Sequence, residues 1–242
     1  DARAKISWGS SSINYLPTTK LKVMVDSANY VQSIPDVPPV VSAIKDTNLL
    51  SEKRKPKILP YIEWDLGKKG YIMKSDLLIL DIIASSNWTR PIYFAVTVGP
   101  EAFIGLERYF QIEGLTYRLV PYAPMRDQPR IDTDIMYDNL MNKAKWGGLD
   151  KNEVWMDENN LRMASTMRMQ MRTLATSLIQ EGKKDKALEV LKKCMEVLPE
   201  RNVPFYDPCP LNYSYYLAQT FYLADGKEEA VKLSNRLFDI IE

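Results

Sequence analysis

Hydrophobic and polar positions follow two different periods along the chain. Up to about residue 130, apolar residues alternate with polar ones or gather in short runs, and beyond that point they recur every three or four residues. The first pattern is typical of short strands and the second of amphipathic helices. We therefore expect an α/β N-terminal part followed by an all-α helical tail.

The first pattern predicts strands at 21–25, 58–64, 92–98 and 115–120 and helices at 75–84 and 102–112. We expect Ser75 to cap the first of these helices and Gly114 to end the second. Residues 92–98 are apolar on both faces, which favours a central strand. Strands and helices alternate along this part, which favours right-handed crossover connections and a small, mostly parallel sheet.

The composition divides the chain into three segments. Residues 1–57 contain several prolines and serines and are expected to form an irregular segment, with one strand and a short helix at 40–44, packed on the next unit. Residues 58–130 form the α/β unit, and residues 131–242 are helical. The charged run at 52–57 has no interleaved aromatic residue, which is typical of a solvated loop and not of a nucleic-acid site.

The helical segment contains a tetratricopeptide-like pattern, predicted at about 171–199 and again at 213–242. Its first copy has small residues where two helices would cross and a turn glycine and a closing proline, at Leu174, Ala175, Leu178, Gly182, Ala187, Leu191, Cys194 and Pro199. Ala187 and its counterpart Ala230 are 43 residues apart (230 − 187), against the ~34 of such repeats, so we expect an inserted loop. Met167 and Met171 lie at helical spacing and are expected in the core.

The composition excludes several functions. The chain has no histidine and two cysteines, so it cannot build a Ser-His or Cys-His nucleophile or a four-ligand structural zinc site, and we expect neither a metal nor a cofactor. Its 32 basic and 31 acidic residues give a net charge of +1, which excludes nucleic acid as an expected partner. No apolar run approaches the roughly 18–20 residues of a membrane span, so we expect no membrane insertion.

Two groups of residues are candidates for binding. Tyr213, Tyr216 and Tyr222 lie on the second predicted repeat, where they could hold an extended polypeptide or simply pack. Parallel sheets bind anions where a strand enters a helix, so a pocket is also expected around Gly99, Glu101 and Arg126.

Four polar and aromatic residues lie close together in the sequence, namely Asp81, Asn87, Trp88 and Arg90. Asp81 could act as a general base with Arg90 binding an anion, but an acid inside an apolar helix followed by an arginine is more typical of a buried structural ion pair. We therefore expect a structural cluster here.

The two cysteines leave two alternatives open. Cys194 and Cys209 are either two unpaired thiols, with Cys194 a small core residue, or one disulfide that closes a loop of about 15 residues.

Four stretches resemble a family of bacterial multi-pass membrane proteins. The most specific is the string Asn87-Trp88-Thr89-Arg90-Pro91-Ile92-Tyr93-Phe94 within residues 74–95. Residues 105–121, residues 145–148 and the tetratricopeptide-like repeat are similar too, so that the resemblance covers most of residues 58–200. This family, first catalogued as being of unknown function, is similar to protein O-mannosyltransferases that use lipid-linked sugar donors.

The resemblance implies a C-terminal soluble region on the periplasmic side of the bacterial inner membrane. The chain begins without a start methionine, so we expect it to be an excised piece tethered through N-terminal membrane helices that it lacks. The implied parent reaction transfers a sugar, such as mannose, from a lipid-linked donor to protein Ser or Thr. The acids of such transferases lie in loops of the membrane part, so no catalytic residue is carried over to this chain.

We therefore expect a non-catalytic module that binds or positions a polypeptide acceptor and contacts its own membrane domain. Two alternatives stay open. One is a tetratricopeptide-type interaction scaffold of a cell-envelope complex without sugar chemistry, and the other is a soluble enzyme that uses carboxylates alone.

Overall fold

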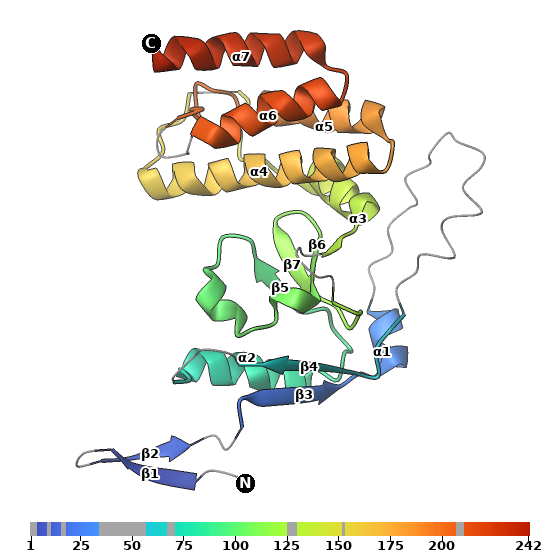
Figure 1. Cartoon of the computed structure of the whole chain (residues 1–242), viewed down its shortest axis with the longest axis vertical. Helices are drawn as coiled ribbons and strands as arrows, with labels where there is room; N and C mark the ends of the chain where they lie inside the picture. Colours follow the sequence, from blue (N-terminus) through green and yellow to red (C-terminus); the bar gives the residue numbers. More distant parts are fainter. Residues whose placement is uncertain are drawn as a thin grey trace.

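The computed structural model describes residues 4–8, 11–15, 18–33, 57–66, 71–124, 130–151, 153–206 and 211–242. Small sheets make up the N-terminal half and helices the C-terminal half, and the two are stacked along the long axis of the molecule (Figure 1). The predicted order, an α/β part followed by an all-helical tail, is confirmed.

Two antiparallel strand pairs open the chain. β1 (Ala4–Trp8) pairs with β2 (Ser11–Tyr15), and β3 (Lys20–Met24) pairs with β4 (Tyr61–Asp65). The second pair confirms the strands predicted at 21–25 and 58–64. The first pair was not predicted, although apolar and polar residues alternate in β1, because the serines and prolines of this segment were interpreted as a sign of irregular structure.

A short helix, α1 (Ser27–Gln32), follows β3 and was also not predicted. It begins at Asp26, whose side chain accepts a hydrogen bond from the backbone N–H of Asn29 at 3.0 Å. Tyr30 of this helix is buried against the sheet. The helix predicted at 40–44 and the charged run up to Pro56 lie outside the described residues.

The main sheet has four strands in the order β5-β7-β6-β8, namely β5 (Tyr93–Ala95), β7 (Thr116–Leu119), β6 (Phe110–Ile112) and β8 (Arg130–Ile131). β7 runs antiparallel to both of its neighbours, and only β6 and β8 are parallel. The parallel character predicted for this sheet is therefore only partial, because one of its three strand pairings is parallel. The strand predicted at 92–98 is short and lies at an edge, with Phe94 as its one buried residue.

The helix predicted at 102–112 does not form. Its place is taken by two 3₁₀ turns (Pro100–Phe103 and Glu107–Tyr109) and by β6. Ile104 and Gly105 have φ of 48° and 83°, which ends the helical path between the two turns. A Cβ at Gly105 would lie 2.5 Å from the backbone oxygen of Asp65, so this site requires glycine. Gly114 forms the turn between β6 and β7 instead of a helix end.

Helix α2 (Lys74–Ser85) forms where it is predicted but is not buried on all sides. Ser75 is not its cap; the backbone N–H of Met73 donates to Oδ2 of buried Asp76 at 3.0 Å. Leu77 and Leu78 are 50% and 60% exposed. This helix therefore covers the sheet on one side only and is not enclosed between two layers.

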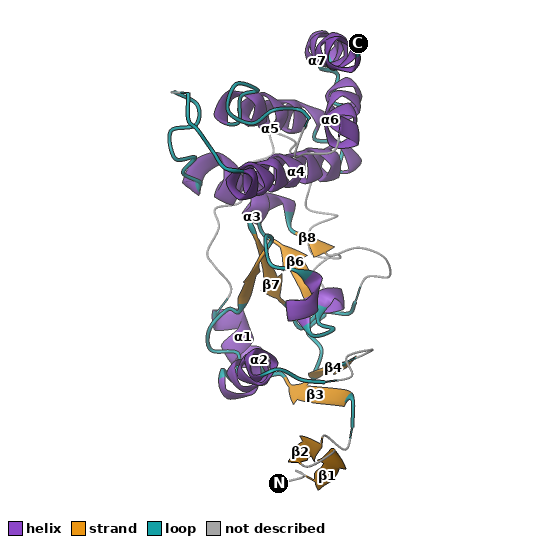
Figure 2. Ribbon diagram, turned by 90° about the vertical axis from the view of Figure 1, so that its left-hand side faces the viewer, coloured by secondary structure: helices purple, strands orange, loops and turns teal. Residues whose placement is uncertain are grey.

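The second half of the chain is helical throughout its regular parts. α3 (Thr133–Tyr137) continues into a π-helical turn (Asp138–Lys143), and four longer helices follow: α4 (Glu158–Gln180), α5 (Lys184–Val197), α6 (Leu211–Leu223) and α7 (Lys227–Ile241). They form two helical hairpins, α4 with α5 and α6 with α7, stacked one on the other (Figure 2). The hairpins lie where the repeats are predicted; their identification as tetratricopeptide repeats stays a prediction.

One hydrophobic core joins the hairpins to the sheet. It contains Ala187, Leu191 and Leu237 of the hairpins together with Ile112 of β6 and Met136 of α3. The methionine stripe of α4 belongs to this core as predicted, with Met171 fully buried. The helices are thus held firmly on the sheet, which fixes the position of any surface they present. Among the described residues, no helix has both the length and the apolar character needed to cross a bilayer.

Candidate binding surface between helices α4 and α6

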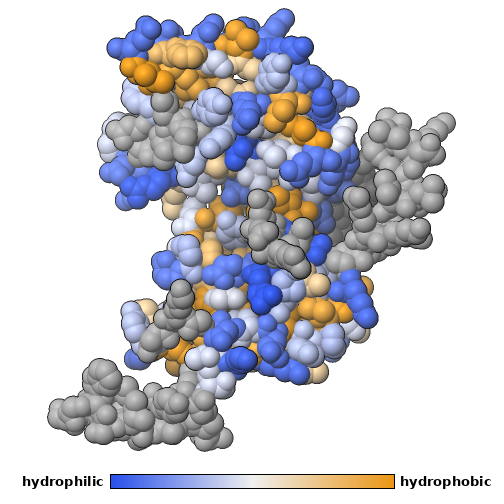
Figure 3. Space-filling view, in the orientation of Figure 1, coloured by the Kyte–Doolittle hydropathy of each residue, from blue (hydrophilic) through white to orange (hydrophobic). Residues whose placement is uncertain are grey.

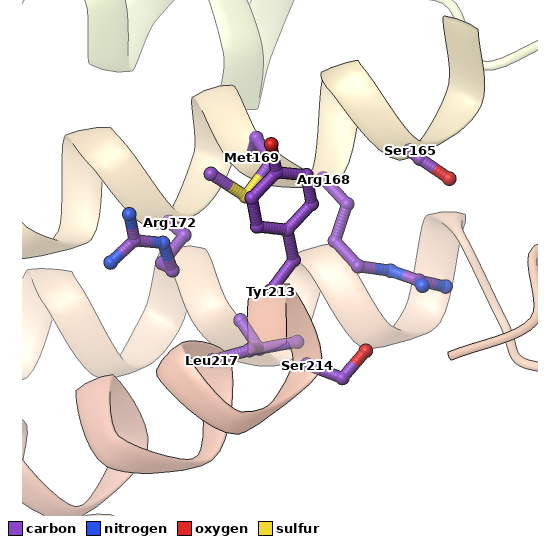
Figure 4. Close-up of a pocket in the computed structure, with 7 residues that line it drawn as sticks. All are labelled: Ser165, Arg168, Met169, Arg172, Tyr213, Ser214 and Leu217. Carbon is purple, nitrogen blue, oxygen red and sulfur yellow. The ribbon is translucent and has the colours of Figure 1, made fainter. Parts of the chain in front are cut away.

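Helices α4 and α6 lie side by side and leave a shallow hollow between them. It is lined by Ser165, Arg168, Met169 and Arg172 of α4 and by Tyr213, Ser214 and Leu217 of α6 (Figure 4). Its free volume is about 10 Å³, room for one water molecule. Small-molecule sites are far larger, so the hollow fits at most part of one side chain of a partner.

Aromatic and apolar side chains stand at the centre of the hollow. Met169 and Tyr213 lie together, and Arg168 and Arg172 extend to opposite sides of them (Figure 4). Tyr213 is 38% exposed and Tyr216, one turn further along α6, is 42% exposed. We call Met169, Arg172, Tyr213 and Tyr216 together the α4–α6 surface.

Arg172 is the cation of this surface. Its guanidinium is half-buried and lies over the Tyr216 ring, 5.6 Å from the ring centroid. Burial lowers the pKa of Arg172, and the electrostatic interaction with Tyr216 partly counteracts this. A guanidinium is nevertheless protonated at any physiological pH, so Arg172 supplies a fixed positive charge.

Arg168 has a structural role instead. Its side chain is buried, and its terminal nitrogens donate to the backbone oxygens of Leu198 at 2.8 Å, Val203 at 2.6 Å and Pro204 at 3.2 Å. The guanidinium also lies 4.8 Å from the ring centroid of Phe205. Arg168 therefore ties the loop that leads into α6 to the middle of α4, and this holds the two sides of the hollow together.

The structure separates the three predicted tyrosines. Tyr213 lines the hollow and Tyr216 lies against the guanidinium of Arg172, whereas Tyr222 lies nine residues after Tyr213, which is half a turn away on the helix. Tyr222 shares its side of α6 with Tyr215, and both are exposed. Tyr213 and Tyr216 form one candidate site, and Tyr222 does not belong to it.

The second predicted binding region is not assembled as expected. Gly99 and Glu101 begin a 3₁₀ turn in the sheet half, far from the helical hairpins (Figure 1). The parallel strand-to-helix crossing on which this pocket was predicted does not form, and Glu101 is exposed. Arg126 lies outside the described residues.

The prediction of a buried ion pair between Asp81 and Arg90 at the end of α2 is wrong. Asp81 and Arg90 are both exposed, as is Asn87, so they form no buried ion pair. An exposed carboxylate avoids the cost of burial, which explains how Asp81 is accommodated in an apolar helix. Trp88 is buried, and its indole N–H donates to the backbone oxygen of Met24 at 2.8 Å.

A buried ion pair does exist, on the main sheet. The Glu113 carboxylate accepts hydrogen bonds from Nε2 of Gln111 at 2.8 Å and from the hydroxyl of Tyr93 at 3.1 Å. Nη1 of Arg118 lies 3.6 Å from the same carboxylate, and Nη2 donates to the backbone oxygen of Ser33 at 3.2 Å. The group therefore joins the end of α1 to the sheet. The sequence did not predict it, because lone charged residues in strands usually face solvent.

Burial perturbs the pKa values of this group. It raises the pKa of Glu113 above the usual range of a glutamate, although Arg118 and the two hydrogen bonds act in the opposite direction. Burial, with the charge of Glu113, also raises the pKa of Tyr93 to about 12. The adjoining crevice, which Ser33 and Arg90 help to line, has no room for a water molecule. We therefore interpret this group as a structural contact between α1 and the sheet.

Cys194 is fully buried in the core, and burial raises the pKa of its thiol to about 11. Cys209 lies outside the described residues, so their pairing stays untested. Within the described ranges, no group of three or more Cys, Asp or Glu residues could hold a metal ion.

Arg172 and Met169 are the members of the surface that were not predicted. A signal was present, because no acidic residue occurs between Glu158 and Glu181 although three arginines do. Hydrophobic periodicity alone assigns this stretch to the core, and α4 is indeed buried over much of its length.

Comparison with known proteins gives one match. The family model of the TMEM260-associated domain 2 matches residues 1–135, which is more than half of the 242 residues. No curated protein and no solved structure is similar to the chain. The match covers the sheets and the start of α3, and the α4–α6 surface lies beyond it.

Proposed function

Because the chain belongs to the TMEM260-associated domain 2 family, we propose that it is a binding and positioning module of a membrane protein similar to O-mannosyltransferases. In this proposal the parent protein transfers a sugar, such as mannose, from a lipid-linked donor to Ser or Thr of a polypeptide. The chain lies on the periplasmic side of the inner membrane and is not itself the catalyst. It holds the polypeptide acceptor near the membrane-embedded reaction centre.

The observation that supports an acceptor-binding role is the α4–α6 surface. Tyr213 and Tyr216 are exposed side by side on a helix whose other side is anchored in the shared core. Tyrosine and arginine are the side chains that most often dominate the energy of protein–protein contacts. The face in Figure 3 shows hydrophobic side chains over the helices among hydrophilic ones.

The shape of the surface favours an extended polypeptide over a small molecule. The hollow holds no more than a fragment of one side chain, whereas the exposed faces of α4 and α6 run alongside it. An extended segment can place one side chain in such a hollow and lay its neighbours along the helices.

The two halves then have separate tasks. The sheet half carries the family match and is proposed to contact the membrane part of the parent protein. The helical half presents the acceptor. The core that joins Ile112 of β6 to the hairpins would keep the acceptor at a fixed distance from the sheet.

An equilibrium binding experiment tests this function. Fluorescently labelled Ser/Thr-containing peptides are titrated with the wild-type chain and with a Tyr213→Ala/Tyr216→Ala variant, and anisotropy reports binding. Two hot-spot tyrosines that become buried in the complex contribute at least ~2 kcal/mol to the free energy of binding, so we expect binding to weaken by about 30-fold or more.

The matched control is Tyr222→Ala, which removes an exposed tyrosine from the other side of the same helix. Tyr215 is left in place because its ring contacts the Tyr216 ring, 5.7 Å between centroids. Tyr222→Ala is expected to bind like the wild type, and equal weakening by it and by the double variant, with both folded by circular dichroism, would contradict the proposed surface.

A further inference from the structure

The α4–α6 surface is positively charged although the whole chain is nearly neutral. From Asn159 to Gln180, helix α4 carries three arginines and no acidic residue, and α6 carries no charged side chain. The whole chain, in contrast, balances 32 basic with 31 acidic residues. Beyond Glu158 at the start of α4, the two helices that form the surface therefore carry positive charge only.

Two of the three arginines already have partners. Arg162 forms an ion pair with Glu158, one turn before it on α4. Arg168 donates to three backbone carbonyl groups, as described above. In the part of the chain that the structure describes, Arg172 forms no ion pair, and its Nε has no hydrogen-bond partner. Arg172 is thus the cation that a ligand could engage.

The environment of Arg172 strengthens its attraction for an anion. The side chain is half-buried and lies against the Tyr216 ring, so water screens its charge less than it would a fully exposed arginine. A guanidinium binds a carboxylate through two parallel hydrogen bonds, and none of the described carboxylates forms an ion pair with Arg172. The half-buried Met169 and the exposed ring of Tyr213 lie beside it.

We propose that the polypeptide segment bound at the α4–α6 surface is acidic, with an Asp or Glu carboxylate on Arg172 and an apolar side chain against Met169 and Tyr213. This inference rests on the proposed function and adds the chemical class of the segment that the site selects.

The far end of the hollow sets the length of the segment. Ser165 lies seven residues before Arg172 on α4, a distance of about 10 Å. This equals about three residues of extended chain. The Ser165 side chain is buried, and its hydroxyl oxygen is closed off from solvent, so Ser165 marks the end of the hollow without bonding to the segment.

The experiment compares three peptides of one design, with Ser, Thr and Leu at constant positions and with Asp/Glu, Asn/Gln or Lys at the variable ones. Anisotropy is measured with the wild-type chain, with Arg172→Gln and Arg172→Lys, and with Arg162→Gln as the matched control on the same helix. Thermal melting checks that each variant is folded.

We expect the acidic peptide to bind the wild type about tenfold or more tightly than its amide counterpart, as for a charge-assisted hydrogen bond. Arg172→Gln should remove this preference, Arg172→Lys should keep part of it, and Arg162→Gln should leave it unchanged. The preference should also weaken between about 50 mM and about 300 mM NaCl, where charges are screened.

The outcomes separate this inference from the proposed function. Equal binding of the acidic and amide peptides would overturn the inference while the binding function stands. Failure of every peptide to bind would overturn both. Arg172-dependent binding of inorganic phosphate that no acidic peptide displaces would also overturn the inference, in favour of a phosphate ligand.

Discussion

Replacement of Arg118 by methionine tests the buried ion pair that pins α1 to the sheet. The Arg118 and Glu113 side chains are each 1% exposed, and their charged groups lie 3.6 Å apart. In Arg118→Met, the Glu113 carboxylate keeps its hydrogen bonds from Tyr93 and Gln111 but loses its opposite charge. Breaking a buried pair on one side costs ~3–5 kcal/mol, and we expect the free energy of unfolding to fall by about that amount.

The pH dependence of this loss has a defined sign. Burial raises the pKa of Glu113 in the folded chain, so the folded state binds more protons than the unfolded state near this pKa. Stability therefore decreases as pH rises from the ordinary pKa of a glutamate through the raised value. Without Arg118, which lowers this pKa, the raised value moves higher still. The penalty at neutral pH grows, and the variant should regain stability as the pH is lowered.

Urea unfolding followed by tryptophan fluorescence measures these effects across a pH series. The control is the double variant Glu113→Gln/Arg118→Met, which leaves no buried charge and should lose less stability than Arg118→Met alone. If both variants lost the same free energy at neutral pH, or if the loss in Arg118→Met did not change with pH, the reasoning would be refuted.

Three further changes have expected results. Gly105→Ala places a Cβ 2.5 Å from the backbone oxygen of Asp65 at a φ of 83° and should lower the free energy of unfolding by ~1–3 kcal/mol. The control is Gly147→Ala, whose φ of 65° is also positive but which has open space around it, so its loss should be smaller. Equal losses in thermal melting of the two variants would show that the close approach to Asp65 does not matter. Asp81→Ala removes an exposed carboxylate and should change the unfolding free energy by no more than about 0.5 kcal/mol, and a large loss would revive the buried ion pair. The Cys194 thiol, buried and with a pKa raised to about 11, should react with a thiol reagent only when the chain unfolds, and rapid labelling of the folded chain would contradict its burial.

The helical half was predictable because its signal is long and periodic. α4 alone offers six turns of apolar spacing, and Gly182 marks the turn into α5. The sheet half was less predictable because its elements are short. Residues 102–112 have enough apolar character for a helix, and only the strained path at Ile104 and Gly105, set by a close approach to Asp65, turns them into 3₁₀ turns and a strand.

Candidate residues were predictable when their chemistry was visible in one segment. Tyr213 and Tyr216 could be selected from α6 by their spacing alone. The pairing of Glu113 with Arg118 depends on a hairpin that the sequence did not predict, and the position of Arg172 beside Tyr216 depends on contact between two helices about 40 residues apart. The burial of Asp81 was predicted wrongly because it depends on how deeply α2 lies within the fold, and the apolar residues of α2 do not reveal that depth.

Hydrogen–deuterium exchange of the chain, with and without a saturating acidic Ser/Thr peptide, tests the central claim most directly. Backbone amides reveal which surface the peptide covers without any substitution. We predict that added protection is confined to α4 around Met169 and Arg172 and to α6 around Tyr213 and Tyr216. Protection that appears only in the sheet half, or nowhere, would contradict the proposal that the helical hairpins present the acceptor.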